Sequence, residues 1–247
     1  MRLLALAPAV FPSEEIARKK LWLFLLSCKR FEIQPALYGM GTKVFPGYAG
    51  MKIDCQLDYL TGIGNGCTHV LYTDSWDVLF TGPLEEIEAK YIGLGQPPIL
   101  VSAFYQLGNI SNELERYPGC FDHSIVYRYP NCGGYIGELP LMIKMFSRMK
   151  ATYPHYGDDS WMWYDAWKEG WFRPVLDSNC EIFQVRSEEN TRIVEDVEGV
   201  AKGIPRIRNE STGSHPCVFH LSGGYASQET GKDDAVMPWA KKLRLVL

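Results

Sequence analysis

Two aspartates that follow a predicted buried strand are the first sign of chemistry in the sequence. The segment "THVLYTDSWDVLF" places Asp74 and Asp77 three positions apart after an apolar run. Side chains three apart on a strand point to opposite faces, so the two carboxylates meet only if the chain turns after Asp74. Carboxylates held together repel each other unless a cation separates them, and Mg²⁺ or Mn²⁺ suits such oxygen ligands. The alternative is an Asx-turn with a solvated second acid. Trp76, between them, is either an ordinary packed aromatic or a flat surface for a nucleobase.

A histidine far along the chain is the candidate third ligand. His220 ends the apolar run of "FHLSGG", where a histidine is more often a satisfied core residue than a ligand. Here Gly223 and Gly224 follow closely, and backbone N–H groups in such a segment can surround a phosphate. Imidazole is also a common metal ligand. The sequence therefore predicts that Asp74, Asp77 and His220 converge on one cation.

Two further segments combine polar side chains with special backbone positions. In "YPNCGGYIG", Asn131 offers amide donors and an acceptor, and Gly133 and Gly134 allow close approach of the backbone to a ligand. The same letters also suit a tight turn before an edge strand. In "YGDDSW", Asp158 and Asp159 either cap a helix or supply a base, a nucleophile or contacts to hydroxyl groups.

The elements that must position these residues alternate in type along the first half of the chain. Apolar runs predict strands and helical periodicity predicts helices between them. Strands are expected at 2–9, 33–38, 69–73 and 97–105, with helices at 13–31, 51–63 and 82–95. Such alternation predicts an α/β fold with a largely parallel sheet and helices on both faces. Ligands bind such sheets beyond the carboxyl ends of the strands, which is where the two aspartates are expected.

The rest of the chain is less regular. Helices are predicted at 140–151 and 158–170, and strands within 175–185 and 215–221. We expect one domain over residues 1–247, with a nucleotide-binding half at 1–105, an acceptor and metal-completing half at 106–225, and a weakly patterned tail at 226–247. The absence of repeats and linkers favours this single domain.

Composition and charge narrow the class of protein. Of 247 residues, 46% are hydrophobic and 22% are charged, as in ordinary globular proteins. The net charge of −4 gives no overall basic field for nucleic acid. Seven cysteines without a CxxC pair indicate reduced thiols, and no run suits a signal peptide or a membrane span. We therefore expect a cytoplasmic location; the oligomeric state is left open.

Taken in order, the motifs resemble the glycosyltransferase domain of the procollagen lysyl hydroxylase family, which has the GT-A fold, a Rossmann-like mixed sheet. The resemblance extends from about residue 4 to residue 224. It is carried by "GYAGMKI", "VLYTDSWDVLF", "ILVSAFY", "YPNCGGYIGELPLM", "GDDSWMWY", "EIFQ" and "FHLSGG". It implies a transferase that moves a hexosyl or pentosyl group from a nucleotide sugar, with a UDP-sugar as the expected donor, to an acceptor hydroxyl.

The resemblance also implies roles for individual residues. The Mn²⁺ (or Mg²⁺) ligands are expected to be Asp74, Asp77 and His220. Donor-binding roles fall to Lys52, Trp76, Asn131, Gly133, Gly134 and Gly223. Asp158 and Asp159 are the expected catalytic acids near the donor sugar and the acceptor.

The sequence departs from the family pattern at three places. Cys132 stands where the family commonly has Ser, and the acidic run around Asp158 is shorter than is common in the family. The segment "HLSGG" replaces a His-Gly pattern, which bears on the pyrophosphate contacts. Without a signal or an attached hydroxylase domain, collagen is not the expected acceptor. Two alternatives stay open: transfer to a hydroxymethylated DNA base, with nucleic acid involved only as acceptor, and a non-catalytic GT-A-like module that binds a nucleotide.

Overall fold

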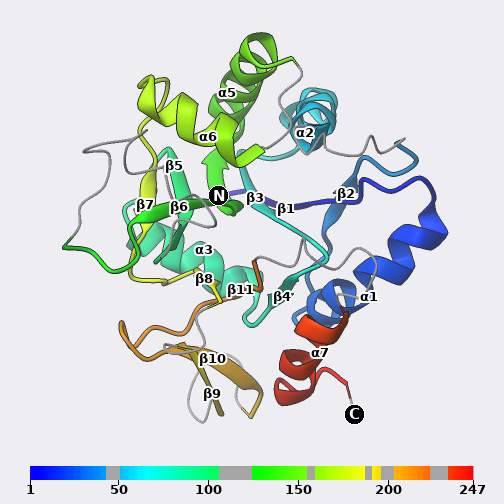
Figure 1. The fold of residues 1–247 in the computed structure, drawn as a ribbon, viewed down its shortest axis with the longest axis vertical. Helices are drawn as coiled ribbons and strands as arrows, with labels where there is room; N and C mark the ends of the chain where they lie inside the picture. Colours follow the sequence, from blue (N-terminus) through cyan, green and yellow to red (C-terminus); the bar gives the residue numbers. More distant parts are fainter. Residues whose placement is uncertain are drawn as a thin grey trace.

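A computed structural model of the chain describes residues 1–42, 51–105, 124–154, 159–186, 191–195, 203–222 and 233–246. Helices and strands alternate through its first half (Figure 1). The helices are α1 (Glu14–Arg30), α2 (Met51–Gly62), α3 (Leu84–Gly93), α5 (Leu139–Thr152), α6 (Asp159–Lys168) and α7 (Asp233–Lys242), with a 3-10 turn, η1 (Gly64–Gly66). The strands are β1 (Leu3–Pro8), β2 (Ala36–Tyr38), β3 (His69–Thr73), β4 (Val78–Phe80), β5 (Ile99–Phe104), β6 (Tyr129–Glu138), β7 (Val175–Asp177), β8 (Phe183–Val185), β9 (Thr191–Glu195), β10 (Pro205–Asn209) and β11 (Val218–His220).

The main sheet has six strands in the order β2-β1-β3-β6-β5-β7. The strands β2, β1 and β3 run parallel to one another, and β5 runs parallel to β7. The long strand β6 is antiparallel to both of its neighbours, β3 and β5. The predicted α/β class is therefore confirmed, as is the mixed sheet of the GT-A fold. Five of the six strands in this sheet run in one direction, so the sheet is also largely parallel, with β6 reversed.

Helices cover both faces of this sheet because successive strand residues point to opposite sides. On β3, Val70 and Tyr72 join a buried cluster with α2, α5 and α6, whereas Leu71 joins a second cluster with α1 and α3. Figure 1 shows the same division, with α2, α5 and α6 on one side of the sheet and α1 and α3 on the other. The central strands are thus buried on both faces, which explains their continuous apolar sequence.

A second, three-stranded sheet of order β4-β11-β8 lies against the lower side of the main sheet. Its middle strand β11 is antiparallel to β4 and parallel to β8. The helix α7 packs beside α1, where Arg30 Nη2 donates to the carbonyl of Arg244 at 2.8 Å. The hairpin β9–β10 forms a separate two-stranded ribbon.

The structure tests several of the predictions made from local sequence. Ser13 caps α1 by accepting a hydrogen bond from the Ile16 N–H, as its position before two glutamates predicted. The second strand was predicted to begin at Ile33, but the Ile33 N–H donates to the Cys28 carbonyl at the end of α1, so that β2 begins only at Ala36. The "YPNCGGYIG" segment is not a turn before an edge strand: it lies inside β6, in the middle of the sheet. Among the described residues, no helix combines the length and the apolar character needed to cross a membrane.

Candidate metal centre

A tight turn after β3 brings the two aspartates to one side of the chain. Its backbone is held at both ends: the Asp74 N–H donates to the Gly133 carbonyl at 2.8 Å, and the Asp77 carbonyl accepts from the Leu221 N–H at 2.8 Å. Between them, Ser75 Oγ donates to the Pro8 carbonyl at 2.6 Å. The turn is therefore fastened to β1, β6 and the end of β11, and its geometry depends on all three.

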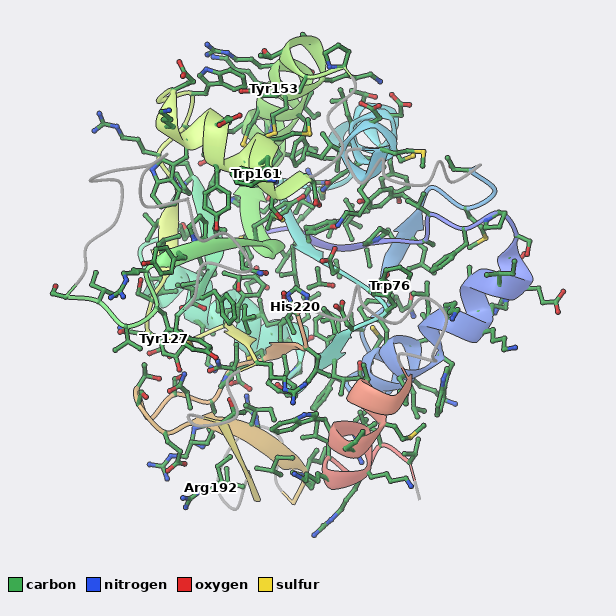
Figure 2. All side chains as sticks on the ribbon, in the orientation of Figure 1. Trp76, Tyr127, Tyr153, Trp161, Arg192 and His220 are labelled. Atoms are coloured by element: carbon green, nitrogen blue, oxygen red, sulfur yellow. The ribbon has the colours of Figure 1, made fainter. Side chains whose placement is uncertain are left out.

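His220 reaches the same place from the opposite end of the sequence. It is the last residue of β11 and lies opposite Val78 of β4 in the small sheet. Its Nε2 atom is 3.5 Å from Asp77 Oδ1 and 3.8 Å from Asp74 Oδ2. One ligand atom from each of these three residues lies within 4.8 Å of the others. Figure 2 shows His220 near the centre of the molecule.

Burial makes this concentration of negative charge costly. Asp77 and His220 are each only 6% exposed, so water screens their charges little. Burial by itself lowers the pKa of His220, but the carboxylates of Asp77 and Asp74 outweigh it, and the pKa is raised above its ordinary value. The site therefore favours positive charge at the point where Nε2 faces the two acids.

A divalent cation fits the donor set and the packing around it. Two carboxylates and one imidazole suit Mn²⁺, and carboxylates also suit Mg²⁺. The backbone at Gly133 closes against the ligands: a Cβ atom there would lie 2.2 Å from His220 Cε1 and 2.9 Å from Asp74 Oδ2. Any side chain at this position would displace two of the three candidate ligands, which accounts for the glycine.

Lys52 links the candidate metal centre to the start of α6. Its Nζ atom lies 3.2 Å from Asp74 Oδ1 and 2.7 Å from Asp159 Oδ2. Asp159 begins α6 and is 8% exposed. The neighbouring thiol of Cys132 lies 3.3 Å from Ser160 Oγ, and burial raises its pKa well above the ordinary range, which keeps it a neutral thiol. Lys52 thus supplies the positive charge between two acids that would otherwise repel each other.

The remaining predicted site residues fall into three groups. Trp76 lies in the turn, with its ring edge-on to Phe11 at 5.9 Å between centroids. Gly134 packs closely against Phe183, since a Cβ there would lie 2.7 Å from Phe183 Cδ1, and its donor-binding role stays a prediction. Asp158 and Gly223 lie outside the described residues, so their expected roles stay predictions.

Two contacts around the ligands have no counterpart in the sequence prediction. Asn131, which was expected to bind the donor, has its Oδ1 atom 3.0 Å from His220 Nδ1. The Tyr72 hydroxyl donates to Asp74 Oδ1 at 2.8 Å. In the sequence Tyr72 is one of several large residues in a buried strand, and only its place two residues before Asp74 hinted at a polar role.

Comparison with known proteins agrees with this geometry. A family model described as the PLOD GT domain matches residues 17–228. The mouse (Mus musculus) procollagen-lysine,2-oxoglutarate 5-dioxygenase 2 is 26% identical over 159 residues, which cover 62% of this chain and 20% of that protein. The chain thus matches about a fifth of the length of this curated relative. Among solved structures, a glycosyltransferase involved in the glycosylation of the major capsid of PBCV-1 aligns over 100% of both chains with a TM-score of 0.53 and 13% identity. The shared fold is of the GT-A type.

Proposed function

The chain belongs to the PLOD GT domain family, and from this premise we propose that it is a metal-dependent glycosyltransferase. The proposed reaction moves a sugar from a nucleotide sugar, preferably a UDP-sugar, to an acceptor hydroxyl. The donor would bind in the half formed by residues 1–105, and residues 106–225 would complete the metal centre and hold the acceptor.

The observation that carries this proposal is the meeting of Asp74, Asp77 and His220 beyond the carboxyl end of β3. Two of these residues follow β3 and the third ends β11, so the contact is made by the fold and not by sequence proximity. Ligands of open α/β sheets bind at such strand ends. Asp74, Asp77 and His220 would hold a cation there, which would supply positive charge opposite a departing nucleoside diphosphate.

The chain's own residues would divide the remaining work. Lys52 lies beside Asp74 and presents an ammonium group to the region where the diphosphate of the donor would lie. Asp159, fixed by Lys52 at 2.7 Å, would orient a hydroxyl of the donor sugar or the acceptor. Trp76 would border the nucleotide. Asp158, which precedes Asp159 in the sequence, would assist it as a second acid.

The test is the release of UDP from UDP-glucose, UDP-galactose and UDP-xylose with Mn²⁺ present. Asp77→Ala should lower this release by at least about 100-fold, since even outer partners of a metal ligand contribute 10- to 100-fold. The matched control is Asp58→Ala, which removes the same charge from an exposed carboxylate of α2 whose side chain is 75% accessible. Asp58→Ala should keep full activity.

Two results would contradict the proposal. The first is unchanged UDP release by Asp77→Ala or by the wild-type protein in excess chelator. The second is binding of UDP without any turnover of the three donors over long incubation, which would identify a non-catalytic nucleotide-binding module instead.

A further inference from the structure

We propose that Asn131 and Tyr72 are positioning residues that select which atom of His220 and of Asp74 faces the cation. This inference rests on the proposed metal-dependent function. Neither residue is a candidate ligand; each holds one ligand through a single hydrogen bond from the side away from the metal centre.

The orientation of the Asn131 amide follows from its second partner. The Gly133 N–H donates to Asn131 Oδ1 at 3.1 Å, and a backbone N–H can only donate. The atom that faces Gly133 is therefore the amide oxygen. The same oxygen lies 3.0 Å from His220 Nδ1, so Nδ1 must carry the proton and donate to it.

This hydrogen bond decides the tautomer of His220. In neutral imidazole one ring nitrogen donates and the other accepts. With the proton on Nδ1, the lone pair lies on Nε2, which is the atom that faces Asp77 at 3.5 Å and Asp74 at 3.8 Å. Asn131 thus keeps Nε2 ready to bind a cation, in the way that carboxylate and carbonyl partners do for other metal-bound histidines.

Tyr72 makes the two carboxylate oxygens of Asp74 inequivalent. Its hydroxyl donates to Oδ1 at 2.8 Å, and Lys52 Nζ contacts the same oxygen at 3.2 Å. The other oxygen, Oδ2, is left to face His220 and Gly133. Asp74 would therefore contribute Oδ2 alone to the cation.

The tyrosine is held firmly enough to fix this choice. It is 2% exposed, and its ring stacks on Tyr135 at 4.5 Å between centroids with an interplanar angle of 12°. Tyr135 is fixed in turn by its hydroxyl, which donates to Gln56 Oε1 at 2.7 Å. The hydroxyl of Tyr72 therefore has a defined position even before a cation arrives, which lowers the cost of ordering the ligand.

The experiment titrates the full chain with Mn²⁺ alone and measures free Mn²⁺ by electron paramagnetic resonance. Asn131→Ala and Tyr72→Phe should each raise the Kd for Mn²⁺ by about 10- to 100-fold. Asn131→Asp keeps an oxygen acceptor for Nδ1 and should restore at least part of the affinity. The control is Tyr91→Phe, which deletes an equally buried hydroxyl that donates to the Pro97 carbonyl, away from the ligands. It should leave the Kd within about 2-fold.

A direct readout of the tautomer complements the titration. In the ¹⁵N spectrum of the wild-type imidazoles, His220 should carry its proton on Nδ1, and this preference should weaken in Asn131→Ala. A wild-type protein in which the neutral imidazole of His220 carries its single proton on Nε2 would overturn the Asn131 assignment even if the variant fails to fold. Wild-type Mn²⁺ affinity in a folded Tyr72→Phe protein would overturn the role proposed for Tyr72. If the wild-type protein itself binds no Mn²⁺, the metal-dependent function fails first, which separates the two cases.

Discussion

Among the residues that the structure describes, two groups of largely buried charged side chains differ in how their charges are paired. In the first, Asp74 and Asp77 face His220 at the end of β3. In the second, Glu86 of α3 receives both guanidinium nitrogens of Arg206 at 2.9 and 2.8 Å and the ammonium of Lys90 at 2.7 Å.

In the second group the acid is fully paired within the chain, since one carboxylate faces two cations. Arg206 is 4% exposed, and it also donates to the His215 carbonyl at 3.2 Å. This group fastens α3 to β10, and its acid needs no cation from outside. In the first group, acids outnumber the cations that the chain supplies, and a buried excess of negative charge calls for a cation from solution. The contrast separates a structural ion pair from a candidate functional site.

The largest expected effect comes from removing the charge of Glu86, the paired acid of the second group. Glu86→Gln leaves the buried guanidinium of Arg206 without its counter-charge, and we expect the free energy of unfolding to fall by about 3–5 kcal/mol. Urea denaturation at pH 7 measures this loss. The Kd for Mn²⁺ of the folded variant should not change; weaker Mn²⁺ binding would show that the two groups are coupled.

The next prediction concerns cation binding by the first group, which would offset its excess of negative charge. Mn²⁺ at a hundred times its Kd should stabilise the wild-type protein by about 2.7 kcal/mol, because the ion binds the folded state alone. Thermal unfolding with and without Mn²⁺ measures this gain. Asp77→Asn should lose it and Asp58→Ala should keep it. Equal stabilisation of Asp77→Asn would place the cation elsewhere.

Removing one acid of the first group should change the free energy of unfolding by a smaller amount, and in the opposite direction to Glu86→Gln. Without a metal ion at pH 8.5, Asp77→Asn should leave the unfolding free energy unchanged or raise it by about 1 kcal/mol, since one of two facing negative charges is removed. Denaturation in chelator tests this. A clear loss of stability would mean that Asp77 is balanced inside the chain, and the contrast between the two groups would fail.

The most gradual expected change is the loss of the stabilisation by Glu86 as the pH falls. Burial raises the pKa of Glu86, but the hydrogen bonds from Arg206 and Lys90 outweigh it and hold the pKa below its ordinary value of 4.5. The stabilisation by this carboxylate is therefore fully present above pH 4.5 and is lost as the pH falls through the folded-state pKa. The stability difference between wild type and Glu86→Gln should shrink over that range. A difference that grows as the pH falls would contradict this sign.

Local patterns predicted most helices and the first strands. Ser13 and the glutamates after it marked the start of α1, and Pro83 marked the start of α3, where it is the residue before the first helical position. These signals are readable because capping and periodicity act over a few residues. The helix α7 was missed within a tail that appeared weakly patterned, although it buries Val236 and Ala240 against β4 and β11.

The role of the glycines in β6 could not be predicted from the local sequence. Its glycines suggested a turn, but they lie where the register between β5 and β6 shifts. There Gly133 packs against His220 and Asp74, and Gly134 packs against Phe183. The glycines are required by neighbours from distant segments, and those neighbours are invisible in a local pattern.

The sequence by itself determined the α/β class, the two acids after a buried strand and the family to which the motifs point. The tertiary structure decided which histidine nitrogen faces those acids, which oxygen of Asp74 accepts from Tyr72, and that Asn131 contacts His220. The physical reason is the distance along the sequence over which each feature acts. Capping, periodicity and strand burial are properties of neighbouring residues. The contact between His220 and Asp74 instead joins residues that only the pairing of β11 with β4 brings together.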